Sequence, residues 1–172
     1  MDGASLYDDD ILAWSEVQAA ALRSLVGRRD LPNQLDLANV VEEIEDAGKS
    51  ELRTVESLIR NILTHLIMLW ADPGAPPTNG WRGEIAAWHE DLLRRISPSM
   101  RQKLDLNLVW RSAVRVACAK LADWDAAKAG AARVALVGST CPLDLAALTS
   151  EELDPADVIG RLQVSTKPDA GP

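Results

Sequence analysis

The sequence predicts an all-α protein, and three observations carry this prediction. Alanine and leucine are abundant, while phenylalanine is absent. Alternating runs of β-branched residues, which are typical of strands, are nearly missing. Apolar residues instead recur at steps of three and four, the period of one helix face. We therefore expect an antiparallel bundle of four main helices with a short C-terminal strap.

Composition and charge limit the class of protein. Of the 172 residues, 47% are hydrophobic and 26% are charged, which is ordinary for a globular protein. The length favours a single domain, placed at residues 1–164, with a flexible tail at 165–172. The net charge of −8 argues against a general nucleic-acid binder or a protein held on an anionic membrane. No signal peptide, transmembrane run or disulfide pattern is evident, so we expect a cytoplasmic protein.

The first helix is expected from about Leu6 to Val26. Three aspartates, Asp8–Asp10, lie in its first turn, where carboxylates favour the positive end of the helix dipole. Gly27 then ends the helix, and Pro32 closes the loop that follows.

The second helix is expected from Leu37 to Leu69, with Asp36 as its N-cap. At a rise of ~1.5 Å per residue it would span roughly 50 Å. A compact domain of this size has a radius of gyration of only about 15–16 Å. The helix should therefore either kink, most naturally at Gly48, or project towards a partner, and a homodimer would suit the second alternative.

A turn over residues 71–80 holds three prolines and two glycines and separates the second helix from the third. The third helix is expected from Asn79, as N-cap, to Ile96. The sequence Ser97-Pro98-Ser99 breaks it and begins the next element, with proline in a first-turn position.

The fourth helix should cover about residues 99–129, with an interruption near 105–107. A further apolar segment, 131–137, lies between two glycines. One or two short turns follow, and Thr149 with Glu152 can form a capping box.

Charge is unevenly distributed along the chain. Residues 36–56 carry seven acids and two bases, a net charge of −5, whereas residues 79–120 carry eight bases and four acids, a net charge of +4. Two interpretations stay open: neighbouring helices of the bundle attract each other, or one of the two faces docks a charged partner.

A candidate interaction surface lies on the second helix and consists of Glu42, Glu43, Glu45, Asp46 and Trp70. The acids wrap around the helix and do not converge, so they lack the five or more oxygens that Ca²⁺ or Mg²⁺ prefers. They could instead be solvated, or bridge across the bundle to an arginine: Arg82, Arg111 or Arg115.

Glu51, on the apolar stripe, is expected to pair with an arginine of the third or fourth helix. Trp70 ends the helix beside the proline-rich turn, and we expect it to be an exposed anchor, with the other tryptophans mostly in the core.

His65 and His89 are the only histidines. If their helices are antiparallel around the turn, the two rings are offset by roughly 6 Å along the axis and could share one metal ion. Glu51 lies about 21 Å from His65 along the helix, too far to join such a site. We expect a structural role for both histidines and no cofactor, with a divalent metal as the alternative.

Several segments resemble an uncharacterised family called domain of unknown function 29. They are DLANVVEEIEDAGKSEL (36–52), HLIMLW (65–70), LYDDDILAWSEVQAAALR (6–23), Trp81 with Ile85, Ser97-Pro98-Ser99-Met100 and Cys141-Pro142. The resemblance covers about residues 5–160 and implies an all-helical bundle, most often found in cyanobacteria and other bacteria. It implies no activity, substrate or cofactor. His89 stands where the family usually has basic or amide residues.

The functional prediction follows from the lack of a convergent polar site. We expect a non-enzymatic cytoplasmic protein-interaction or regulatory module, with an unidentified protein partner and no nucleic-acid or membrane partner. The alternative is a metal-binding helical-bundle enzyme centred on His65 and His89.

Overall fold

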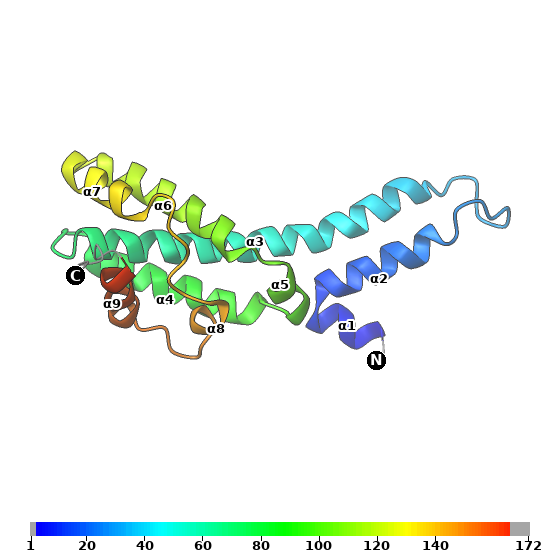
Figure 1. Cartoon of the computed structure of the whole chain (residues 1–172). Helices are drawn as coiled ribbons and strands as arrows, with labels where there is room; N and C mark the ends of the chain where they lie inside the picture. Colours follow the sequence, from blue (N-terminus) through cyan, green and yellow to red (C-terminus); the bar gives the residue numbers. More distant parts are fainter. Residues whose placement is uncertain (1–2, 166–172) are drawn as a thin grey trace, which may run out of the picture. The chain divides into compact units, whose positions relative to one another are not determined.

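The computed structural model describes residues 3–165, and every regular element in that range is a helix, which confirms the all-α class. Nine helices lie in this range rather than four main ones. They are α1 (Gly3–Asp9), α2 (Ile11–Arg23), α3 (Leu37–Ala71), α4 (Thr78–Arg95), α5 (Pro98–Lys103), α6 (Leu106–Ala122), α7 (Ala126–Leu136), α8 (Leu145–Leu148) and α9 (Pro155–Ser165) (Figure 1).

The chain divides into two compact units. The first unit comprises residues 1–55 and 95–104, and the second comprises residues 56–94 and 105–172. The helix α3 contributes residues to both units. A single domain over residues 1–164 stays a prediction.

Asp10 divides the first predicted helix in two and caps α2. Its buried carboxylate accepts hydrogen bonds from the Ser97 hydroxyl at 2.8 Å, from the Ser99 hydroxyl at 2.6 Å and from the Ser99 backbone N–H at 2.9 Å. Burial alone would raise the pKa of Asp10, but these bonds and one from the Ala13 backbone N–H outweigh it and lower the pKa. A continuous helix over 6–26 is therefore wrong, because Asp10 leaves helical geometry to bind the Ser97–Ser99 segment.

The long second helix is confirmed as α3, which begins just after Asp36. The Asp36 carboxylate accepts a hydrogen bond from the Asn39 backbone N–H at 3.2 Å, as expected of an N-cap. The helix continues through Gly48 without a break. A Cβ at Gly48 would collide with the Ser15 hydroxyl and come within 3.2 Å of the Leu12 Cα, so this glycine allows α2 to approach α3 closely.

The second unit is built around the C-terminal half of α3. All eight residues from Ile62 to Leu69 are buried, so more than two turns of the helix are covered on every side. Apolar side chains of the other helices of this unit are buried as well, among them Ile85, Leu92, Ala117, Leu121, Leu148 and Leu162. Even so, none of the described helices combines the length and the apolar character that a bilayer crossing requires.

The fourth predicted helix is three helices in the structure. The expected interruption near 105–107 is confirmed, since Asp105 caps α6 and its carboxylate accepts from the Leu108 N–H at 3.0 Å. A second interruption was not expected: Asp125 caps α7 by accepting from the Lys128 N–H at 3.0 Å. Gly130 consequently lies inside α7.

Side-chain hydrogen bonds tie the C-terminal segment to α6. The Trp110 indole donates to the Ser139 hydroxyl at 3.1 Å, and the Cys141 N–H donates to the Asn107 amide oxygen at 3.1 Å. The capping box predicted at Thr149 is wrong, because α9 begins only at Pro155. Ser165 ends α9, and the rest of the predicted tail lies outside the described residues.

Candidate functional site

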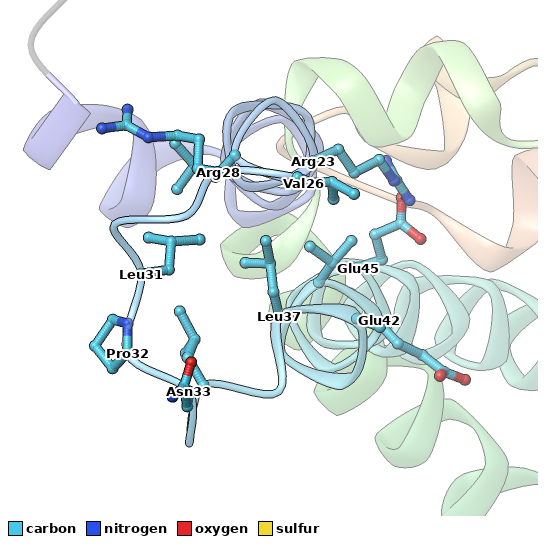
Figure 2. A pocket seen from close by; sticks show the side chains of 14 residues that line it. Arg23, Val26, Arg28, Leu31, Pro32, Asn33, Leu37, Glu42 and Glu45 are labelled. Atoms are coloured by element: carbon cyan, nitrogen blue, oxygen red, sulfur yellow. The ribbon is translucent and has the colours of Figure 1, made fainter.

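A hollow opens where the chain returns from α2 to α3, and we call it the loop pocket (Figure 2). Gly27 has a φ of 87°, a left-handed conformation that allows the tight turn after α2. The hollow has a volume of about 620 Å³. Its apolar lining comprises Leu25, Val26, Leu31, Pro32, Leu35, Leu37, Ala38 and Val41. In Figure 2 the side chains of Val26, Leu31 and Leu37 face the same space.

Most charges at the rim of the loop pocket are neutralised by a neighbour. Arg23 forms an ion pair with Glu45, and Arg28 forms one with Asp30. The bond from Arg23 lowers the pKa of Glu45, so this carboxylate stays ionised at neutral pH. Glu42 also lines the pocket, is exposed, and has no ion-pair partner among the described residues. The unbalanced charge at this rim is therefore negative.

The acids of the predicted interaction surface all lie in the first unit. Glu42 and Glu43 are exposed, while Glu45 and Asp46 both form ion pairs with Lys49, at 3.6 Å and 3.2 Å. The expected bridging of these acids to Arg82, Arg111 or Arg115 is not found among the described residues: the ion-pair partners of Glu45 and Asp46 come from α2 and from α3 itself.

The expected pairing of Glu51 is confirmed. Its carboxylate lies 3.2 Å from the guanidinium of Arg95, which belongs to the third predicted helix. Both side chains are partly exposed, so the pair adds little to stability, and its main effect is to balance a charge near the core.

Trp70, predicted as an exposed anchor, is half-buried at the end of α3 in the second unit. The exposed tryptophan is Trp124, which was expected in the core and has 48% of its surface accessible. It follows the end of α6, and one face stacks on Trp81 with ring centroids 5.7 Å apart. The periodicity assigned Trp124 to a buried stripe, but the helix ends before that residue.

His65 is buried between two oxygen acceptors. Its Nδ1 lies 3.0 Å from the Asn61 carbonyl oxygen, and its Nε2 lies 3.0 Å from the Glu84 carboxylate. The ring meets Trp88 edge-on, with centroids 4.8 Å apart. Burial lowers the pKa of His65, and Lys120 lowers it further, against the opposing effects of the Asn61 carbonyl and Glu84.

Both nitrogens of His65 thus have protein contacts, whereas the Nε2 of His89 is buried with no hydrogen-bond partner. Within residues 3–165, no group of three His, Cys, Asp or Glu side chains is placed to hold a metal ion. Among the described residues, His65 and His89 therefore have no third side chain that could complete the alternative metal site.

Glu84 is the residue that sequence reasoning missed at this place. The antiparallel turn over residues 71–80 could have indicated it, because Glu84 and His65 lie at similar distances from the two sides of that turn.

Comparisons with known proteins agree with this helical fold. The family model described as Domain of unknown function DUF29 matches residues 6–152. A solved structure of an alpha-helical protein of unknown function from Rhodospirillum rubrum is 38% identical, with a TM-score of 0.79; the match covers 91% of this chain and 96% of that one. No curated protein matches.

Proposed function

The chain belongs to the DUF29 family, whose description carries no activity, and from the geometry of the loop pocket we propose that it is a protein-interaction module. The observation that carries the proposal is an apolar hollow of about 620 Å³ next to unpaired acidic side chains. The partner that fits is a protein segment with an apolar anchor and an adjacent lysine or arginine.

Exposed apolar surface supports a binding role for this pocket. Val26 has 71% of its surface accessible, and Leu35 has 41%. Both line the same hollow, so these exposed apolar side chains gather at one place of the surface. Apolar patches of this kind mark interaction sites, because covering them with a partner removes apolar surface from water.

The charges favour a basic partner. Since Arg23 and Arg28 are paired with carboxylates of this chain, they offer little attraction to an acidic one. Glu42 at the rim and Glu43 beside it have no ion-pair partner among the described residues, so they remain available to a lysine or arginine. Such contacts mainly set specificity and the rate of association.

Selection of peptides from a random display library against the intact chain tests this function. We expect enriched peptides to combine a large apolar residue with a basic one. Val26→Glu places a charge in the hollow and Glu42→Gln removes the rim charge, and each should weaken binding of a selected peptide about tenfold, the effect of roughly 1.4 kcal/mol.

The matched controls come from the same unit and lie outside the pocket. Val17→Glu changes an exposed valine of α2, and Asp8→Asn changes an exposed acid of α1. Both should bind the peptide as the unchanged chain does. Peptides that bind all four variants equally, or a library without pocket-dependent binders, would refute the proposal.

Two further features belong to the same proposal. We place the protein in the cytoplasm, which is supported by the free thiols of Cys118 and Cys141. We also propose an antiparallel four-helix arrangement of α3, α4, α6 and α7 within the second unit. The short connections between α3 and α4 and between α6 and α7 support it, as does the packing of α6 on α7.

A further inference from the structure

A second hollow lies between α6 and α7, and we call it the α6–α7 pocket. Its volume is about 450 Å³, within the range of small-molecule sites. It is lined by Arg111, Val114, Arg115, Cys118, Arg133, Leu136, Val137 and Gly138. All of these residues belong to the second unit, whereas the loop pocket belongs to the first.

Three guanidinium groups line this hollow, and its lining includes no carboxylate. Arg111 and Arg115 are one turn apart on α6, and Arg133 comes from α7. None of the three forms an ion pair with another described residue, whereas four other arginines of the chain each pair with a carboxylate: Arg23, Arg28, Arg94 and Arg95. In a chain with a net charge of −8, three unpaired cations in one hollow form a site for an anion.

An adjoining hollow extends the positive region. It has a volume of about 400 Å³ and shares Arg111 and Arg115 with the α6–α7 pocket. Arg60 of α3 also lines it, with Glu56 as the one carboxylate of its lining. Arg111 and Arg115 thus line both hollows.

The rest of the α6–α7 pocket is apolar. Val114 and Leu136 are buried, and Val137 is exposed beside Gly138 at the end of α7. Burial raises the pKa of the Cys118 thiol, so the thiol is neutral and does not repel an anion. No other hydrogen-bonding side chain lines the hollow, so its chemistry is limited to arginines above an apolar floor.

From this combination we propose that the α6–α7 pocket binds a small amphipathic anion, a molecule with one carboxylate or phosphate group on an apolar body. The anionic group binds Arg111, Arg115 and Arg133, whose planar guanidinium groups match both carboxylate and phosphate. The apolar body packs against Val114, Leu136 and Val137, and removes the exposed surface of Val137 from water.

Isothermal titration of the intact chain with four probes tests the chemistry of the ligand. Octanoate and octyl phosphate carry both features, octanol lacks the charge, and inorganic phosphate lacks the apolar body. We expect one-to-one binding of octanoate, octyl phosphate or both, at least tenfold tighter than octanol or inorganic phosphate. The relative affinities of octanoate and octyl phosphate identify the anionic group.

Variants then locate the ligand. Arg111→Gln with Arg115→Gln should weaken binding at least tenfold, and Val137→Glu should do the same by placing a negative charge in the hollow. The controls are Arg53→Gln, an exposed arginine of the first unit, and Val134→Glu, an exposed valine of α7 that does not line the pocket. All changed residues are exposed, so circular dichroism should be the same for each variant.

Four results would overturn the proposal. If octanol bound as tightly as octanoate and octyl phosphate, the hollow would be an apolar site without a role for the charge. If inorganic phosphate bound as tightly as they do, it would be an anion site without a role for the apolar body. If the control variants lost as much affinity as the pocket variants, the ligand would not bind in this pocket. If neither octanoate nor octyl phosphate bound, the pocket would not be a site for an amphipathic anion.

Discussion

A neutral imidazole has one N–H, yet His65 faces an oxygen acceptor at each ring nitrogen. The Asn61 carbonyl and the ionised Glu84 carboxylate can both only accept, so the neutral ring donates to one of them and leaves the other without a donor. Both acceptors receive an N–H, and the contact with Glu84 becomes an ion pair, only when the ring gains a second proton. Burial opposes that protonation, and a buried histidine with a lowered pKa is the result.

This balance predicts how the pKa of His65 responds to its neighbours. NMR titration should give a pKa below the ordinary 6.5. Glu84→Gln removes a charge that favours the imidazolium and should lower the pKa further, whereas Lys120→Gln should raise it. Because the folded pKa lies below the unfolded one, the unfolded chain takes up the proton first, so this group's contribution to stability falls as the pH drops below about 6.5. A higher pKa of His65 in the Glu84→Gln variant would contradict the proposed effect of the Glu84 charge on this histidine.

At this scale the sequence predicted some pairings and missed others. Glu51 had to find a cation because it lies on an apolar stripe, and Arg95 is that cation. The partners of Asp10 could not be predicted, since Ser97 and Ser99 lie far along the chain and only the folded unit brings them to the carboxylate. Helix periodicity carries no information about such distant hydrogen bonds.

At the scale of elements, Gly48 decides how closely α2 and α3 pack. Gly48→Ala should destabilise the protein by about 1–3 kcal/mol, because the new Cβ meets Ser15 and the Leu12 backbone, although alanine is the better helix former. Gly83→Ala is the matched control: Gly83 lies inside α4, and its Cβ would meet nothing within 4 Å. It should stabilise by up to about 1 kcal/mol. Urea unfolding measures both changes, and a stabilised Gly48→Ala would refute the close approach.

Helix boundaries show where prediction from periodicity ends. The N-cap at Asp36 was found because an aspartate directly precedes an apolar-periodic run. The caps at Asp10 and Asp125 were missed because the apolar period continues across them, and each aspartate can equally lie in a helix. Whether such a residue caps or continues a helix depends on what its carboxylate can bind in the fold.

At the scale of the whole molecule, α3 contributes several turns to each of the two units. Separating them would require ending the helix near residues 55 and 56 and leaving several backbone groups without helical partners. We therefore expect thermal unfolding in one cooperative transition, as a single domain over residues 1–164 requires. In a Trp14→Phe variant, tryptophan fluorescence, excited selectively over that of Tyr7, comes from the second unit alone, whereas far-ultraviolet circular dichroism reports on both. Midpoints that differ between the two signals would show independent units.

The uneven distribution of charge could be predicted from the sequence, but most of the ion pairs that these charges form could not. Glu45, Asp46 and Glu51 of α3 form their ion pairs within the first unit. Arg111 and Arg115 of α6 form no ion pair with another described residue. Both pockets escaped prediction, because a hollow depends on where loops and helix ends fail to fill space. The loop pocket needs the turn at Gly27, and the α6–α7 pocket needs the break at Asp125 that starts α7.

The enclosed stretch from Ile62 to Leu69 has a consequence for how this sequence can change over evolutionary time. A helix with a solvent face can exchange its outer residues freely by neutral drift, but every one of these eight positions contacts protein. A larger, smaller or charged side chain at any of them needs a compensating change on a neighbouring helix. Substitutions here should therefore accumulate in coupled pairs, while the surface of the same protein diverges one residue at a time.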